Sequence, residues 1–336
     1  MKYQQHQYIE RDTFRIKTEK VYGDQILKLI YSKTRENAPV LFRALMSSRV
    51  SRFLGFLNYD LPLGANVTGI KRFIKMLPIN FSECLDNPES LNTARKIFER
   101  KIRYWESRPM PEFSAAIISP ADSKALVGSF RETSQLFLKG KFFDFDDLLG
   151  VDKKEWLRVF YQGDFAVFRL TPDKYHYNHT PVAGNVVDIY QIPGGYHSCN
   201  PSAVINIVTP LSKNKRVVTI IDTDVDGGTK AGLVAMIEIV ALMIGDIFQC
   251  YSETKYDSPQ DVIRGMFLKK GQPKSLFRPG SSTDVLIFQK GRVRFSQDLV
   301  TNMYNQEAQS RYSLGFGKPL VETEVKVRSQ IATSIP

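Results

Sequence analysis

The sequence of 336 residues has little cysteine, little histidine and no segment typical of secretion. Its three cysteines, Cys84, Cys199 and Cys250, lie far apart and none belongs to a Cys-x-x-Cys pair. The sequence therefore indicates neither a disulfide framework nor a thiolate metal site. The N-terminal segment Met1–Glu10 is polar, whereas a secretory signal requires an apolar stretch behind a basic start. We expect a protein of the reducing cytoplasm.

The sequence also lacks an uncharged membrane-spanning segment. Its most apolar stretch, residues 231–248, is about long enough to cross a bilayer, but it contains Glu238 and Asp246. It follows the pair Gly227 and Gly228, which is typical of a turn between strands. We predict buried strands here rather than a transmembrane helix.

Several common catalytic motifs are absent. The sequence has no Gly-x-x-x-x-Gly-Lys phosphate loop, no His-Glu-x-x-His zinc helix and no Gly-x-Ser-x-Gly nucleophile elbow, which argues against the commonest ATPases, metallopeptidases and hydrolases. Residues 222–227 copy the opening of a calcium-binding EF-hand loop, yet Leu233 stands at the twelfth position, where a bidentate glutamate is needed. We predict a polar turn there and expect no metal ion.

The composition indicates a folded, basic protein. With 43% hydrophobic and 12% aromatic residues, the chain can bury a large core. The formal charge of +11 favours an anionic partner, such as nucleic acid, an acidic membrane surface or a phosphorylated substrate. Because the chain has no recognisable nucleic-acid-binding module, we expect no nucleic acid partner.

The pattern of apolar residues changes along the chain. From Tyr22 to about Tyr104 they recur at helical spacing, whereas short β-branched and aromatic runs separated by turn residues follow residues 108–111. The predicted fold class is α+β, with a helical, membrane-associating region at 1–108 packed on a mainly antiparallel, β-rich catalytic domain at 109–336.

The predicted helical region carries basic residues beside apolar ones. Arg43, Arg49 and Arg52 lie beside residues such as Phe42 and Leu45, as a helix at an anionic membrane interface requires. The same apolar face could instead cover the β domain. Both interpretations stay open at this stage.

Two of the four histidines, His176 and His179, lie three residues apart. Imidazole is well suited to moving protons near neutral pH, so one histidine could deprotonate a nucleophile while the other serves a substrate. A pair of structural histidines, or half of a metal site, would give the same spacing.

Two further segments carry hydroxyl and carboxyl groups. Pro279 and Gly280 fix a tight turn just ahead of Ser281 and Ser282, and such a turn can hold a backbone carbonyl within reach of the next hydroxyl. Asp122 ends a β-like run and could orient a histidine. Alone, each segment also fits an ordinary loop or turn.

Taken together and in this order, these segments resemble the phosphatidylserine decarboxylase family. The matching motifs are Ser-Pro-Ala-Asp at 119–122, Tyr-His-x-x-His-x-Pro-x-x-Gly at 175–184 and Gly-Ser-Ser-Thr at 280–283. Weaker similarity includes Arg-Pro at 108–109, Lys-Gly at 139–140, Leu-Leu-Gly at 148–150 and Asn-Pro at 200–201, so the resemblance covers nearly the whole chain.

The resemblance implies a self-processing relay in which Asp122 orients His179 and His179 deprotonates Ser282. Ser282 would attack the preceding carbonyl, and the chain would split between residues 281 and 282. Ser282 would become a covalent pyruvoyl group, a ketone that serves as electron sink in place of pyridoxal phosphate. His176 would act in the decarboxylation. No metal is implied.

Some points stay open in the sequence. Family members usually have glycine immediately before the pyruvoyl-forming serine, whereas this chain has Ser281, so Ser281 is an alternative to Ser282. The resemblance implies phosphatidylserine as substrate, peripheral contact with an anionic phospholipid membrane from the cytoplasm, and two chains from one precursor, with a homodimer also open. The alternatives are a decarboxylase of a free aromatic amino acid and a basic lipid-binding relative without enzymatic activity.

Overall fold

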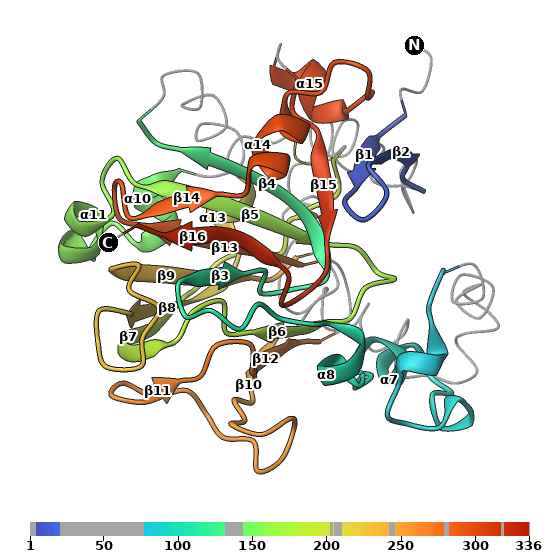
Figure 1. Ribbon diagram of the computed structural model, residues 1–336, viewed down its shortest axis with the longest axis horizontal. Coiled ribbons are helices and arrows are strands. Elements are labelled where there is room, and N and C mark those ends of the chain that lie inside the picture. Colours follow the sequence, from blue (N-terminus) through green and yellow to red (C-terminus); the bar gives the residue numbers. More distant parts are fainter. Residues whose placement is uncertain are drawn as a thin grey trace.

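The computed structural model describes residues 5–20, 77–131, 144–201, 204, 210–241, 246–278, 282–316 and 319–335. Its main feature is a ten-stranded sheet in which every neighbouring pair is antiparallel except β1 and β15 (Figure 1). In spatial order its strands are β11 (Phe267–Leu268), β7 (Gly184–Ile192), β8 (Arg216–Asp222), β9 (Leu233–Ile239), β13 (Ser282–Phe288), β5 (Asp164–Leu170), β4 (Ser123–Ser129), β15 (Glu322–Val325), β1 (Gln7–Glu10) and β2 (Arg15–Thr18).

Two three-stranded sheets complete the β structure. One has the order β10 (Ile247–Gln249), β12 (Pro273–Phe277) and β6 (Tyr177–His179), and the other has β14 (Val293–Phe295), β16 (Gln330–Ser334) and β3 (Ala116–Ile118). The mainly antiparallel β part of the prediction is confirmed, and residues 231–248 contain the predicted strands. Among the described residues, no helix is long and apolar enough to span a bilayer.

The described helices are few and short. They are η3 (Phe81–Glu83), η4 (Pro88–Ser90), α7 (Ala94–Phe98), α8 (Tyr104–Ser107), α10 (Phe145–Leu149), α11 (Lys154–Val159), α13 (Pro210–Lys213), α14 (Gln297–Met303) and α15 (Arg311–Phe316). Residues 5–20 form strands of the large sheet, not part of the helical region predicted for 1–108. The predicted interfacial helix with Arg43, Arg49 and Arg52 lies outside the described residues, and the boundary near residue 108 stays a prediction.

The central strand β13 is buried along its whole length because both faces of the sheet are covered. Its side chains alternate between two apolar clusters: Val285 and Ile287 enter one, while Leu286 and Phe288 enter the other. Burying each such side chain stabilises the fold by roughly 1.5–3 kcal/mol. Burial on both faces explains why residues 285–288 of this strand form a continuous apolar run.

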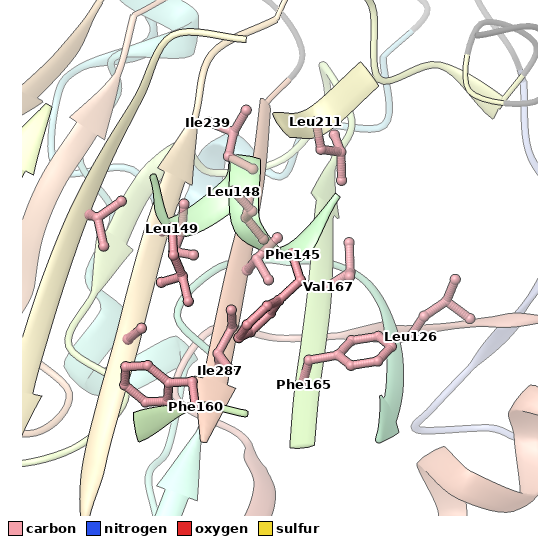
Figure 2. Close-up of a cluster of buried hydrophobic side chains, with 14 of the residues drawn as sticks. Leu126, Phe145, Leu148, Leu149, Phe160, Phe165, Val167, Leu211, Ile239 and Ile287 are labelled. Atoms are coloured by element: carbon pink, nitrogen blue, oxygen red, sulfur yellow. The ribbon is translucent and has the colours of Figure 1, made fainter. Parts of the chain in front are cut away.

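Helix α10 covers the first of these clusters. The Asp144 side chain accepts hydrogen bonds from the backbone of residues 146 and 147. The helix ends at Leu149 and is followed by Gly150, whose φ of 101° is a conformation that glycine adopts without strain. Figure 2 shows Phe145 and Leu148 of this helix turned toward the side chains of the sheet, including Ile287. The opposite face of the large sheet packs against both small sheets: its apolar cluster includes Ile117 of β3 and Ile331 of β16, and Glu238 of β9 bonds to residues of β6, β10 and β12.

The predicted calcium-like segment is a turn. Asp222 ends β8 and accepts a hydrogen bond from the Asp224 backbone N–H at 2.9 Å. Asp224 forms an ion pair with Arg292 at 2.6 Å. The polar turn between β8 and β9 is therefore confirmed.

Candidate active site

The topology brings the predicted site residues toward one end of the large sheet. Strand β5 is antiparallel to both β4 and β13, so β4 and β13 begin at the same end of the sheet. Asp122 directly precedes β4 and Ser282 is the first residue of β13. His179 ends β6, and its backbone N–H donates to the carbonyl of Pro120 at 2.7 Å, which ties β6 to the loop carrying Asp122.

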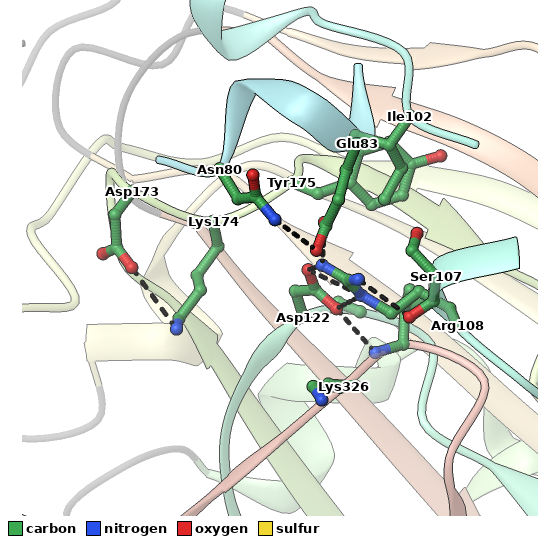
Figure 3. A network of polar contacts seen from close by, with 12 residues as sticks. Asn80, Glu83, Ile102, Ser107, Arg108, Asp122, Asp173, Lys174, Tyr175 and Lys326 are labelled. Atoms are coloured by element: carbon green, nitrogen blue, oxygen red, sulfur yellow. Dashed lines mark hydrogen bonds and ion pairs between the residues drawn. The ribbon is translucent and has the colours of Figure 1, made fainter. Parts of the chain in front are cut away.

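Asp122 is buried and held by an arginine. Arg108 Nε donates to Oδ1 at 2.9 Å and Nη2 donates to Oδ2 at 2.8 Å, while the Val327 N–H donates to Oδ1 at 2.8 Å (Figure 3). Burial tends to raise the pKa of Asp122, but the Arg108 charge and hydrogen bonds outweigh it and hold the pKa below its usual range. Asp122 is therefore an anion. Glu83 also pairs with Arg108, at 3.0 Å.

His179 is fully buried and both of its ring nitrogens have partners. Nδ1 lies 2.9 Å from the Gly271 carbonyl, and because a carbonyl only accepts, Nδ1 carries the hydrogen. Nε2 lies 3.0 Å from the Tyr175 hydroxyl, which in turn lies 2.7 Å from the Tyr256 hydroxyl.

The pKa of His179 is lowered to about 3, chiefly by burial and also by the charges of Arg328 and Arg108, while the Gly271 carbonyl and the Asp122 charge act in the opposite direction. The imidazole is thus neutral at pH 7, with a lone pair on Nε2, which is the form that a general base requires. The backbone carbonyl of Gly271 selects this tautomer.

Ser282 is also fully buried, and among the described residues its hydroxyl oxygen has no hydrogen-bond partner. Its carbonyl accepts a hydrogen bond from the Cys199 thiol at 3.7 Å. Ser281, the alternative serine, lies outside the described residues. Within the described part of the chain, no hydrogen bond joins Asp122 to His179 or His179 to Ser282.

His176 lies beside the segment that leads to Ser282. Its carbonyl accepts from the Phe277 N–H at 3.1 Å, so it adjoins the end of β12, a few residues before Ser282. Its Nδ1 bonds the Lys174 carbonyl at 2.8 Å, and its ring lies 4.7 Å from that of Phe98.

A buried polar cluster between the sheets was not predicted. Glu238 of β9 accepts hydrogen bonds from Lys274 at 2.8 Å, Gln249 at 3.0 Å and Asn178 at 3.4 Å, and from Ser275. These four donors come from β6, β10 and β12, so Glu238 ties the small sheet to the large one. The available signal was a glutamate inside an apolar strand, which a buried position tolerates only with partners.

A second charged cluster contains the one group of potential metal ligands in the described residues. His6, Glu19 and Glu322 bring three ligand atoms within 4.8 Å of one another. Arg169 donates to Glu322 Oε1 at 2.9 Å and to Glu19 Oε2 at 2.6 Å, and Lys124 pairs with Glu19 at 2.9 Å. Burial favours a raised pKa for Glu19, but the Arg169 charge brings it below its usual range. The cluster is an ion-pair network that fastens the N-terminal hairpin to the sheet.

Comparison with known proteins decides the family. The phosphatidylserine decarboxylase family model matches residues 94–311, which is more than half of the chain. The chain belongs to the phosphatidylserine decarboxylase family. This family comprises carboxy-lyases, so the protein is an enzyme of that class.

Three relatives illustrate the similarity. The phosphatidylserine decarboxylase proenzyme of Fusobacterium nucleatum is 30% identical over 308 residues, covering 91% of this chain and 95% of the relative. The Vibrio campbellii proenzyme is 29% identical over 262 residues, with 74% and 89% covered. Proenzyme 2 of Oryza sativa is 32% identical over 242 residues, with 69% and 35% covered. In this decarboxylase family member, the matched region contains Asp122, His176, His179 and Ser282.

Proposed function

We propose that this protein is a self-cleaving, pyruvoyl-dependent decarboxylase that converts phosphatidylserine to phosphatidylethanolamine. The observation that carries the proposal is Ser282, a fully buried serine with an unpartnered hydroxyl among the described residues, at the start of the central strand. The relatives are named as proenzymes, which fits a chain that matures by its own cleavage.

In this proposal, His179 Nε2 takes the proton of the Ser282 hydroxyl. The neutral imidazole supports this role, but Nε2 must first exchange its hydrogen bond with Tyr175 for one with Ser282. The Asp122 charge favours the protonated imidazole and so assists the transfer, although its hydrogen bonds go to Arg108 and Val327. Asp122 thus contributes through its charge rather than through a bond to His179.

The Ser282 oxygen then attacks the carbonyl of Ser281, and the amide becomes an ester. Elimination of the ester releases a chain of residues 1–281, and hydrolysis leaves a pyruvoyl group at the start of residues 282–336. Attack by Ser281 on the carbonyl of Gly280 is the alternative for the same chemistry.

The surroundings of Ser282 fit a pyruvoyl group. The proposed cut precedes β13, so this strand keeps its pairing with β5 and β9 on both sides. Burial excludes water, which suits a ketone that acts as an electron sink for decarboxylation. In our proposal the His176 imidazole, close to the segment leading to Ser282, holds the substrate carboxylate or supplies a proton.

The substrate proposal rests on the family and on the basic charge of +11, which suits an anionic phospholipid. We expect the enzyme to work from the cytoplasm as a peripheral protein at the membrane surface. A homodimer is compatible with this arrangement. A free aromatic amino acid as substrate is the competing outcome of the test below.

The test is a liposome assay that measures phosphatidylethanolamine formed from phosphatidylserine vesicles. We expect product from the wild-type protein and none from Ser282→Ala, while Ser281→Ala stays active. Release of carbon dioxide from soluble tryptophan or tyrosine, without reaction on vesicles, would replace the lipid with an amino acid as substrate. Binding of the wild-type protein and of Ser282→Ala to vesicles, without decarboxylation by either, would support a non-enzymatic lipid-binding protein.

A further inference from the structure

Asp284 is a buried acid without a partner, two residues after Ser282. Its side chain is fully buried, and neither carboxyl oxygen has a hydrogen-bond partner among the described residues. Burial raises its pKa well above the usual value and the charge of Glu238 raises it further, while Lys274 acts in the opposite direction. Burial therefore favours the protonated form of Asp284.

The neighbours of Asp284 add to the effect of burial on its pKa. In the register of β13 and β9, Asp284 lies directly opposite Glu238. Glu238 already takes the Lys274 ammonium, which also donates to Gln249 at 2.9 Å. A second carboxylate opposite the first would be destabilising, and the buried Lys274 ammonium is already shared between Glu238 and Gln249.

Asp284 and Ser282 lie on the same face of β13. Side chains alternate along a strand, and Leu286 and Phe288 continue the same face into one apolar cluster. Two residues along a strand span roughly 6.4–6.8 Å, so Asp284 and Ser282 are neighbouring positions on this face. Within the described part of the intact chain no hydrogen bond joins their side chains, so proton transfer between the two positions requires the Asp284 carboxyl group to turn toward Cβ of residue 282.

An unpartnered buried acid costs stability, and such groups gather at functional sites. We propose that Asp284 is the acid that delivers a proton to Cβ of residue 282 during maturation, after the chain has been cut. This inference rests on the proposed self-cleavage.

The proposed step is a proton transfer in two halves. Elimination leaves residue 282 with a Cα=Cβ double bond and a free amino group. The Asp284 O–H bond breaks and a Cβ–H bond forms from the double-bond electrons, while the nitrogen lone pair forms a C=N bond. The N–H proton then returns to the Asp284 carboxylate, which regenerates the acid. Water finally replaces nitrogen by oxygen, and ammonia leaves.

The experiment separates cutting from ketone formation. Freshly made precursor is followed by gel for chain cleavage and by mass spectrometry after hydroxylamine treatment for the ketone. In wild type we expect the ketone to appear together with the small chain. In Asp284→Asn we expect cleavage at a similar rate and a ketone that appears about 100-fold more slowly, because general acids contribute roughly 10²–10⁴-fold. Asp284→Glu, which keeps an acid, should recover much of the rate.

Thr219→Val is the matched control. Thr219 on β8 is also fully buried with an unpartnered oxygen among the described residues, but it is paired with Ile189 and Met236 away from Ser282. In Thr219→Val the ketone at residue 282 should appear together with the small chain, as in wild type. The inference is overturned if Asp284→Asn forms the ketone as soon as the chain is cut. It is also overturned if Asp284→Asn fails to cleave, because Asp284 would then act in the cutting step. If wild type itself never cleaves, the proposed function fails instead.

Discussion

At the scale of single residues, burial has opposite outcomes for the two aspartates near Ser282. Asp122 stays charged because Arg108 and the Val327 N–H satisfy it, whereas burial, and then the charge of Glu238 opposite, raise the pKa of Asp284 and favour its protonated form. His179 is neutral because it is buried. The site therefore combines the Asp122–Arg108 ion pair with two groups, His179 and Asp284, whose burial favours their uncharged forms.

Asp284→Asn should change the pH dependence of stability. Because the folded pKa of Asp284 is raised, wild type loses stability as pH rises above 3.8, its ordinary value, up to the folded pKa. Over that window the variant should gain about 1.4 kcal/mol per pH unit relative to wild type, and below it the difference between the two proteins should no longer change with pH. Urea unfolding across pH, in the uncleavable Ser282→Ala background, measures the difference. A difference independent of pH would mean that folding does not raise the pKa of Asp284.

Arg108→Met should strongly destabilise the protein, because it leaves the Asp122 carboxylate buried and unpaired. The expected loss is about 3–5 kcal/mol, and Asp122→Asn in the same chain should restore part of it. Lys326→Met is the control, since its ion pair with Asp12 is exposed and should matter little. Urea midpoints in the Ser282→Ala background give the comparison. Equal losses for the two variants would show that Asp122 does not depend on Arg108.

The sequence identified the candidate residues Asp122, His176, His179 and Ser282 because their motifs are local strings of residues. It could not reveal that Arg108 holds Asp122, since that pairing depends on how α8 and the loop before β4 pack. For the same reason, the state of Asp284 is invisible without the strand opposite it.

At the scale of elements, the proposed cleavage and maturation both depend on β13, because this strand begins with Ser282. Its strand was predicted, because a buried β-branched run has a clear signature. The N-terminal hairpin β1–β2 was missed: its strands are short and mostly polar, and β1 pairs with β15 from the far end of the chain. Such long-range pairing leaves no local pattern.

Leu286→Ala should lower the free energy of unfolding, because it removes packing between β13 and the rest of the core. Leu286 is fully buried, so we expect a loss of about 2–5 kcal/mol. Ile263→Ala, at a position 59% exposed, should have little effect. Urea unfolding of both variants in the Ser282→Ala background tests this. Similar losses would mean that β13 is not the packed centre of the sheet.

At the scale of the whole molecule, the proposed cut yields two chains without a covalent link. Cys84, Cys199 and Cys250 are free, and residues 282–336 contain no cysteine. Strands β13 and β15 of the small chain each pair with neighbours from the large chain on both sides. We expect the chains to co-elute in reductant and to separate only in denaturant. Separation in native buffer would contradict the sheet topology.

The most direct test of the central claim is the mass of the denatured, purified protein with and without hydroxylamine. Cleavage at the predicted serine gives a chain of residues 1–281 and a small chain that begins at residue 282 and reacts as a ketone. A single intact chain, or a small chain beginning at residue 281, would contradict the assignment of Ser282.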